Sequence, residues 1–295
     1  MCPLRNAKST RRLSAGGRLL SVSGRGRPGR PWPPQHAALA RLLLRPAATI
    51  RLACLDLADK QRRGGKCIAW VRQLCEWEPM TEHNFEPMRR AMIACQLRTT
   101  GTNDPAVLAA MGEVARERFV PAGRIALAYA DALVPLKPGR QLNSPMALGR
   151  LLTEAAPEKA AKALVVGAAT GYAAAVVAKL TPHVVAVEED PELAATAREA
   201  LAGTGVTLIE GPLGEGHAEG GPYDLILIDG AVEFVPQALV DQLKDGGKLA
   251  AAILEDGVTR LALGRKAGEG FGMAAFADAA AAILPGFVKP KAFTF

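Results

Sequence analysis

Aromatic residues, cysteines and long apolar runs are scarce in this 295-residue sequence. Aromatics make up 5%, and no stretch reaches the roughly 18 uninterrupted apolar residues of a membrane-spanning helix, which argues against a membrane partner. All three tryptophans and four of the five cysteines precede Met80, so the remainder holds one cysteine, Cys95, and no internal disulfide. The early cysteines lack a CxxC spacing, so we expect no metal site. A reducing, cytoplasmic compartment fits this pattern.

Positive charge is concentrated in the first quarter of the chain. Residues 1–79 hold 13 Arg and 3 Lys against 4 acidic residues, whereas residues 80–295 hold 20 basic and 25 acidic residues. A leader so rich in Arg, Pro and Gly has too little apolar surface for a packed core. It is interpreted as a basic tail for nucleic acid or an acidic surface, as an organellar transit peptide, or as sequence upstream of a start at Met80. We favour the last interpretation. Any nucleic-acid binding would depend on residues 1–79 alone.

The pattern over residues 80–160 predicts a helical cap followed by a loop. Apolar residues at helical spacing predict a helix over 86–97, and Asp104 before Pro105 predicts the start of a second helix. A loop punctuated by Pro and Gly follows over 134–145. Pro145 then begins a helix that we expect to end near Ala155.

Residues 161–295 alternate between short apolar runs and helical stretches, which is typical of a doubly wound, mostly parallel α/β sheet. The expected strands are Ala163–Val166, Val184–Val187, Val206–Ile209, Leu225–Ile228 and Lys248–Ile253. The expected helices between them are Tyr172–Leu180, Pro191–Leu201 and Pro236–Leu243. The chain then predicts a terminal antiparallel hairpin from Val258–Lys266 and Phe271–Leu284.

A glycine-containing turn follows the first of these strands and indicates a nucleoside site. It consists of Gly167, Ala168, Ala169, Thr170, Gly171 and Tyr172. The second strand ends at Glu188, 21 residues after Gly167, where a carboxylate can accept hydrogen bonds from ribose hydroxyls. The spacing G-x-x-x-G suits S-adenosylmethionine better than a dinucleotide, because no pyrophosphate needs a nest of amides. Structural readings remain open, namely a plain turn at the glycines and a helix-start acid at Glu188.

Several segments, in order, resemble the protein-L-isoaspartate O-methyltransferase family. The similar segments are Arg90–Gly101, Val114–Pro121, Tyr129–Pro135, Gln141–Pro145, Gly167–Tyr172, Tyr223–Ile228 and Leu243–Leu249. The resemblance covers about residues 82–254 well and 255–295 loosely. It implies a Rossmann-like methyltransferase fold and methyl transfer from S-adenosylmethionine to the α-carboxylate of L-isoaspartyl residues in damaged proteins, with isoaspartyl proteins or peptides as partners.

The chain departs from the family pattern at four places. Val165 stands where the family usually carries an acid, Ala169 replaces a middle glycine, and Pro212 replaces an acid after the third strand. In the loop before Pro145, Asn143 takes the place of the functional serine and Ser144 follows it. Two alternatives therefore stay open: a catalytically degenerate relative that binds a ligand or peptide, and a methyltransferase for another substrate.

Polar donors in the 139–145 loop would orient the substrate carboxylate, so Asn143 and Ser144 are the candidate catalytic residues. Their structural readings are a loop residue bonded to its own backbone and a helix N-cap, respectively. Asp229, at the carboxyl end of the fourth core strand, is a candidate for lining the cofactor crevice, or else a loop cap. The pattern gives no indication of an oligomeric state.

Overall fold

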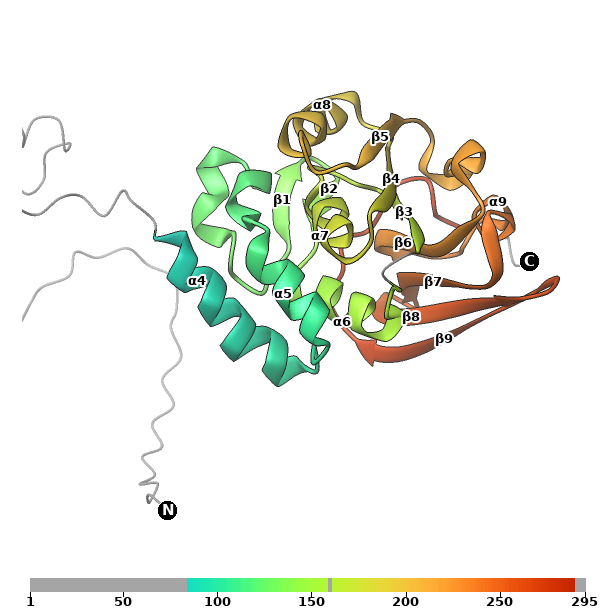
Figure 1. Cartoon of the computed structure of the whole chain (residues 1–295), viewed down its shortest axis with the longest axis horizontal. Helices are drawn as coiled ribbons and strands as arrows, with labels where there is room; N and C mark the ends of the chain where they lie inside the picture. The colour runs from blue at the N-terminus through green and yellow to red at the C-terminus, as the bar shows by residue number, and fades with distance from the viewer. Residues whose placement is uncertain (1–83, 159–160, 290–295) are drawn as a thin grey trace, which may run out of the picture. The chain divides into compact units, whose positions relative to one another are not determined.

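The computed structural model describes residues 84–158 and 161–289 (Figure 1). The leader, residues 1–79, and the proposed start at Met80 lie outside this described part. No helix within it is both long and apolar enough to cross a membrane.

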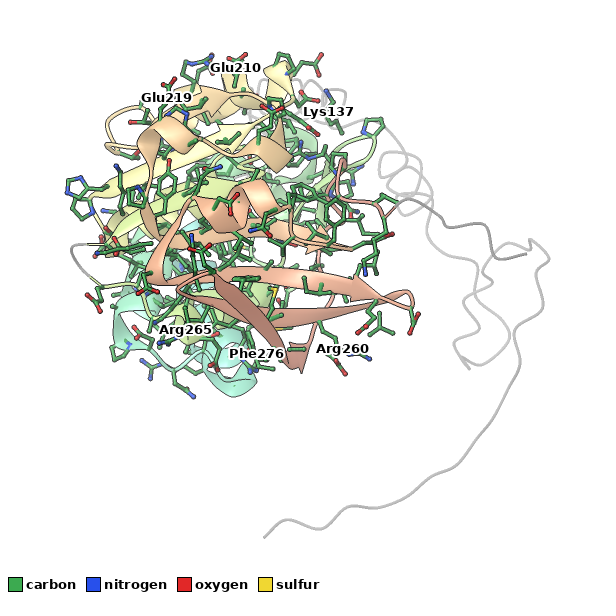
Figure 2. All side chains as sticks on the ribbon, turned by 90° about the vertical axis from the view of Figure 1, so that its right-hand side faces the viewer. Lys137, Glu210, Glu219, Arg260, Arg265 and Phe276 are labelled. Atoms are coloured by element: carbon green, nitrogen blue, oxygen red, sulfur yellow. The ribbon has the colours of Figure 1, made fainter. Side chains whose placement is uncertain are left out.

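A seven-stranded sheet in the order β5-β4-β3-β6-β7-β8-β9 forms the centre of the fold. The first five strands in that order run parallel, and β8 and β9 join them antiparallel. The strands are β3 (Lys162–Val166), β4 (His183–Glu188), β5 (Thr207–Glu210), β6 (Tyr223–Val232), β7 (Leu243–Glu255), β8 (Val258–Ala267) and β9 (Gly270–Asp278). This confirms the predicted doubly wound, Rossmann-like α/β fold. Figure 2 shows Glu210 of β5 at one end of the molecule and Arg260 and Phe276 of the hairpin at the other.

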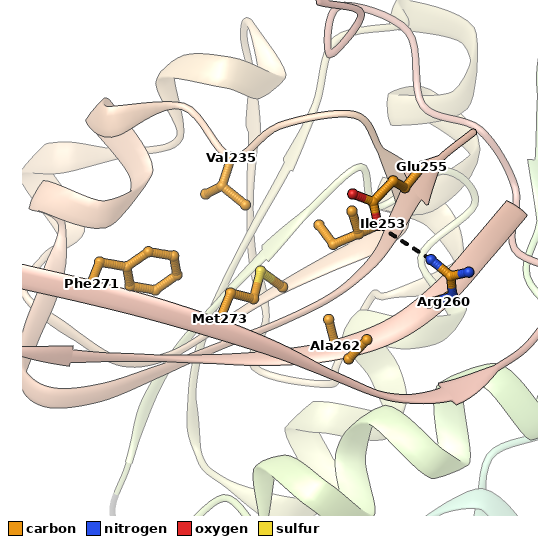
Figure 3. Close-up of a pocket in the computed structure, with 8 residues that line it drawn as sticks. Val235, Ile253, Glu255, Arg260, Ala262, Phe271 and Met273 are labelled. Carbon is orange, nitrogen blue, oxygen red and sulfur yellow. Dashed lines mark hydrogen bonds and ion pairs between the residues drawn. The ribbon is translucent and has the colours of Figure 1, made fainter. Parts of the chain in front are cut away.

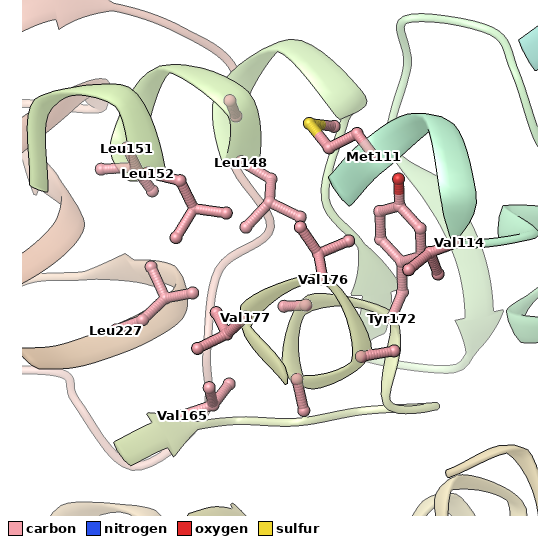
Figure 4. Packing of buried hydrophobic residues seen from close by; sticks show 14 of the residues in the cluster. Met111, Val114, Leu148, Leu151, Leu152, Val165, Tyr172, Val176, Val177 and Leu227 are labelled. Carbon is pink, nitrogen blue, oxygen red and sulfur yellow. The ribbon is translucent and has the colours of Figure 1, made fainter. Parts of the chain in front are cut away.

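Apolar side chains cover both faces of the parallel strands. On β3, Val165 packs with Leu152 and Val177 of the helices on one face (Figure 4), whereas Leu164 and Val166 join a second cluster on the opposite face. The α-helices are α4 (Phe85–Ala91), α5 (Pro105–Glu113), α6 (Pro145–Ala155), α7 (Tyr172–Leu180), α8 (Pro191–Ala200) and α9 (Gln237–Asp241). Val165 is fully buried in this apolar cluster, so it is a core residue of the fold.

Three helices begin with the same local chemistry, a capping side chain followed by proline. The carboxylate of Asp104 accepts from the backbone N–H groups of Ala106 and Val107 at the start of α5. Asp190 does the same at the start of α8, and the Ser144 hydroxyl accepts from Ala147 N at 3.3 Å in α6. Each cap satisfies backbone donors that the first helical turn leaves free, which fixes where the helix begins.

Shorter helical turns complete the cap and the loops. The expected helix over 86–97 is α4 continued by a π-helical segment. These segments are η1 (Met92–Leu97), η2 (Arg98–Thr100), η3 (Arg116–Phe119), η4 (Ala122–Leu127), η5 (Leu213–Glu215) and η6 (Ala218–Gly220).

The structure corrects two expectations about extended segments. The loop over 134–145 contains a hairpin of β1 (Val134–Lys137) and β2 (Arg140–Leu142), which its prolines and glycine concealed. The second strand of the terminal hairpin ends at Asp278 rather than Leu284. Beyond it the chain crosses to the end of β6, where Ala231 N donates to Ala282 O and Leu284 N donates to Ala231 O.

Candidate functional site

The turn between β3 and α7 is held in a left-handed conformation at three positions. Gly167, Ala169 and Gly171 have φ angles of 78°, 50° and 98°. Such angles suit glycine, and an alanine there costs roughly 1–2 kcal/mol. Ala169 is held in place because its N–H donates to a carboxylate oxygen of Glu188 at 2.6 Å. Gly167 N and Ala168 N both donate to Val187 O at 3.0 Å, which fixes the turn against the end of β4.

The carboxylate of Glu188 is fully buried at the end of β4 and receives hydrogen bonds from every side. Besides Ala169 N, the backbone N–H groups of Glu189 and Asp190 donate to it at 3.1 and 3.0 Å. Arg140 of β2 forms a bidentate pair with it, at 2.5 Å to Oε1 and 2.7 Å to Oε2. Burial alone would lower the pKa of Arg140, but the hydrogen bonds and charge of Glu188 raise it overall. Five donors fill a carboxylate that offers about four lone-pair sites.

A second ion pair joins the β1–β2 hairpin to the same region. Lys137 Nζ lies 2.7 Å from both Asp190 Oδ2 and Glu192 Oε2 at the start of α8. Its side chain is 30% exposed, against 6% for that of Arg140. The hairpin is thus attached by a buried arginine and by a partly exposed lysine, and Figure 2 shows Lys137 at the surface.

Asn143 connects three segments of the chain. Its amide Nδ2 donates to Asp229 Oδ1 at 2.7 Å, and its Oδ1 accepts from Ala282 N at 2.7 Å. Its backbone carbonyl accepts from Arg116 Nη2 at 2.6 Å. The side chain is buried and both its polar groups are used, so Asn143 fastens the loop to β6 and to the crossing segment. It does not bond to its own backbone in the contacts described.

Arg116 and Tyr172 retain hydrogen-bonding capacity in the interior. Both are buried, and the guanidinium carbon of Arg116 lies 4.5 Å from the centre of the Tyr172 ring. Arg116 donates from Nε to Ala128 O at 2.7 Å, yet its Nη1 and the Tyr172 hydroxyl have no hydrogen-bond partner among the described residues. Burial lowers the pKa of Arg116 and raises that of Tyr172. Unpaired buried donors are costly, and they are the groups with which a ligand can bond.

Asp229 lies beside this pair at the carboxyl end of the parallel part of β6, where strands β3 and β4 also end. It is 5% exposed. Burial raises its pKa, against the hydrogen bond from Asn143 and the charges of Arg116 and Arg140, which lower it. Asp229 therefore lies with Glu188 in one buried group of charges.

The side chain of Leu284 packs against both Gly167 of the turn and Gly230 of β6. A β-carbon on Gly167 would lie 3.0 Å from a methyl group of Leu284, and one on Gly230 would lie 2.3 Å from its Cγ. Glycine is therefore required at both positions by close packing, and at Gly167 also by its positive φ. The crossing segment thus contacts the turn directly, a feature that the expected longer strand would not have produced.

A separate cavity of about 380 Å³ lies on the β7–β9 part of the sheet (Figure 3). Val235, Ile253, Phe271 and Met273 line it with apolar surface, and its charged rim is a 3.2 Å ion pair between Glu255 and Arg260. It shares no lining residue with the polar cluster. We therefore place the candidate site at the cluster around Glu188 and Asp229.

The sequence interpretation missed the two buried arginines. Arg116 is part of a segment that resembles the family but has no predicted role, and Arg140 stands in the 139–145 loop, where the sequence predicts a role for Asn143 and Ser144 alone. The available signals were the place of Arg116 in a segment that resembles the family, Val114–Pro121, and the place of Arg140 in the loop expected to hold the substrate carboxylate. The part of the chain that the structure describes contains no cluster of three or more His, Cys, Asp or Glu side chains that could hold a metal ion.

Comparison with known proteins gives a consistent result. A family model described as Protein-L-isoaspartate(D-aspartate) O-methyltransferase matches residues 88–278. A protein-L-isoaspartate O-methyltransferase of Methylorubrum populi is 40% identical over 187 residues, which cover 62% of this chain and 88% of that protein. A protein-L-isoaspartate O-methyltransferase of Bradyrhizobium is 37% identical over 190 residues, which cover 63% of this chain and 88% of that protein.

Solved structures share the fold at lower identity. A protein-L-isoaspartate O-methyltransferase superposes with a TM-score of 0.60 at 23% identity, over 67% of this chain and 66% of the other. A putative protein-L-isoaspartate O-methyltransferase from Plasmodium falciparum, in complex with S-adenosyl-L-homocysteine, superposes with a TM-score of 0.58 at 21% identity. The match covers 69% of this chain and 99% of the other. These two likenesses concern the fold alone.

Proposed function

Because this chain belongs to the protein-L-isoaspartate(D-aspartate) O-methyltransferase family, we propose that it methylates the α-carboxylate of L-isoaspartyl residues in damaged proteins. The observation that carries the proposal is the family match over residues 88–278, which spans both the Gly167–Gly171 turn and Glu188. S-adenosylmethionine is the methyl donor of this family, and isoaspartyl-containing proteins or peptides are the partners. We place the reaction in the cytoplasm, as the near absence of cysteine after Met80 suggests.

Methyl transfer requires the protein to align the methyl donor with the carboxylate and does not require it to transfer a proton. When bound, S-adenosylmethionine supplies a methyl group on a positively charged sulfur. With that group bound, a carboxylate oxygen would take the methyl carbon, and the electron pair of the broken carbon–sulfur bond would stay on sulfur as a neutral thioether. The carboxylate is already ionised at neutral pH, so no residue of the chain has to act as a base. The site's task is to hold the two groups in line.

The residues at the turn are of the kind that bind a nucleoside, although Arg140 engages the carboxylate of Glu188 in this structure. Positive φ at Gly167 and Gly171 shapes the turn at the start of α7, and a buried carboxylate ends the neighbouring strand. We assign cofactor binding to Gly167, Ala168, Ala169, Gly171, Tyr172, Glu188 and Asp229.

We assign the substrate side to the loop that ends at Pro145. Ser144 caps α6 through its oxygen, which leaves its hydroxyl proton for the substrate carboxylate. Asn143 has both amide groups engaged, so its part is to position the loop and the crossing segment. Arg116 Nη1 and the Tyr172 hydroxyl are the further donors available nearby.

The direct test is methyl transfer to a matched pair of peptides. Full-length protein is incubated with methyl-labelled S-adenosylmethionine and either an isoaspartyl peptide or the same peptide with aspartate. We expect base-labile label on the isoaspartyl peptide alone, and its loss when Ser144→Ala is combined with Asn143→Ala.

Other outcomes identify the alternatives. Label that appears on another acceptor but never on the isoaspartyl peptide would indicate a different substrate. Binding of S-adenosylhomocysteine with no transfer to any acceptor would indicate a ligand-binding relative, which is favoured by Asn143, because both of its amide groups are engaged with other parts of the protein.

A further inference from the structure

Glu188 has no hydrogen-bonding capacity left in the structure, although its place at the end of β4 is where a ribose would bond. Two of its five donors come from Arg140 and three are backbone N–H groups that belong to the turn and to the start of α8. The backbone donors cannot leave without unfolding those segments. Arg140 is the one residue among these that donates from its side chain, so it is the donor that a ribose hydroxyl would replace.

Arg140 is also joined to the substrate side of the site. It lies on β2, three residues before Asn143 and four before Ser144, in the loop to which we assigned the substrate carboxylate. The other attachment of its hairpin, Lys137 to Asp190 and Glu192, is partly exposed and contributes little. The position of Arg140 therefore depends mainly on Glu188.

We propose, on the basis of the proposed function, that Arg140 is a positioning residue that passes from Glu188 to the substrate. Ribose hydroxyls of the cofactor displace the guanidinium from Glu188, and the freed guanidinium then forms a bidentate pair with the α-carboxylate of the isoaspartyl residue. Cofactor binding thereby creates the substrate site, so the cofactor binds first. A guanidinium fork matches a carboxylate in geometry, and a buried cation without a partner is strongly unfavourable, which gives the exchange its direction.

The first arm of the test measures cofactor binding without any substrate. S-adenosylhomocysteine is titrated by calorimetry into the full-length wild type, Arg140→Met and Lys137→Met. Removal of the competing guanidinium should tighten binding in Arg140→Met by about 10-fold, the equivalent of one charge-assisted hydrogen bond. Lys137→Met removes the exposed attachment of the same hairpin and should leave the affinity unchanged. Weaker or unaltered binding in a folded Arg140→Met protein would overturn the proposal.

The second arm measures the substrate. At saturating cofactor, Arg140→Met should raise KM for the isoaspartyl peptide by about 10- to 100-fold with a much smaller change in kcat, and Arg140→Lys should recover part of the loss. A merely structural defect would weaken both ligands together, so opposite effects on cofactor and peptide are the diagnostic result. A KM unchanged by Arg140→Met would refute the transfer of Arg140 to the substrate.

A third measurement needs no variant and covers the case in which Arg140→Met fails to fold. Wild-type protein is titrated with isoaspartyl peptide in the presence and absence of S-adenosylhomocysteine. Saturable binding only with S-adenosylhomocysteine supports the exchange, and equal binding in both conditions contradicts it. Because the first arm contains no substrate, it judges the displacement of Arg140 even if wild type methylates nothing, which separates this proposal from the proposed function.

Discussion

The substitution Asn143→Asp reverses one hydrogen bond while preserving the shape of the side chain. In the wild type the amide of Asn143 donates to Asp229 Oδ1 at 2.7 Å. After the substitution two buried carboxylates face each other, and one of them must bind a proton. Protonating an aspartate with a reference pKa of about 3.9 costs about 4 kcal/mol at pH 7 and about 1.4 kcal/mol less for each pH unit below that. Because burial already raises the pKa of Asp229, 4 kcal/mol is the upper limit.

The stability lost in Asn143→Asp should therefore be largest at pH 7 and should shrink toward pH 4. Adding Asp229→Asn should restore most of it, because the carboxylate at position 143 can then accept from both the new amide and Ala282 N. Asn103→Asp makes the same chemical change at an exposed position and should cost little at either pH. Urea unfolding of the full chain gives the free energies. Far-ultraviolet circular dichroism is the suitable signal, since all three tryptophans precede Met80.

Two results would refute this reasoning. A loss in Asn143→Asp that is the same at pH 5 and pH 7 would mean that no proton is taken up between the two carboxylates. A double variant no more stable than Asn143→Asp would mean that the amide–carboxylate contact with Asp229 does not hold the loop.

Three further predictions concern buried groups. Tyr172→Phe removes a hydroxyl that makes no hydrogen bond of ordinary length among the described residues, so the free energy of unfolding should change by less than about 1 kcal/mol. Peptide kcat/KM should fall because the substrate carboxylate loses a donor, and an unchanged kcat/KM would contradict that role. Gly230→Ala should cost about 1–3 kcal/mol through its clash with Leu284, whereas Gly123→Ala, with open space around it, should not lower the Tm. Burial raises the pKa of all three tyrosines, those of Tyr129 and Tyr223 to about 12, so tyrosinate absorbance at pH 10.5 should be much weaker in the folded protein than in the unfolded protein. Since the folded state then binds more protons than the unfolded state, stability should fall as the pH rises from about 10 to 12.

Local signals in the sequence predicted most of the fold. Capping residues followed by proline marked the starts of α5, α6 and α8, and α6 and α7 begin and end where expected. The apolar runs predicted all five parallel strands, although β6 and β7 extend further because their neighbours provide hydrogen bonds beyond the apolar stretch. These features depend on residues that are close in sequence, so the local sequence pattern was enough to predict them.

The arrangement of the site depended on contacts that are distant in sequence. Arg140 and Glu188 are 48 residues apart, and Asn143 bonds to residues 86 and 139 positions away. The sequence singled out Glu188 and Asp229 from their places at strand ends, and the structure places both in one buried group of charges. The sequence could not show that Arg140 forms an ion pair with Glu188, because the position of a residue in a loop gives no indication of its burial. The roles assigned to Asn143 and Ser144 stay predictions.

The buried charges of the site explain why a cofactor should precede the substrate. Arg116, Arg140, Glu188 and Asp229 form a group whose formal charges sum to zero, so the site has no net attraction for a further carboxylate. A cofactor with a cationic centre adds one positive charge, which an isoaspartyl carboxylate then balances at low effective dielectric. We therefore expect an unreactive analogue with an amine in place of the sulfonium to raise peptide affinity more than neutral S-adenosylhomocysteine does. Equal peptide affinities with the two ligands, measured by calorimetry at the same ionic strength, would show that displacement of Arg140, rather than the added charge, accounts for the coupling.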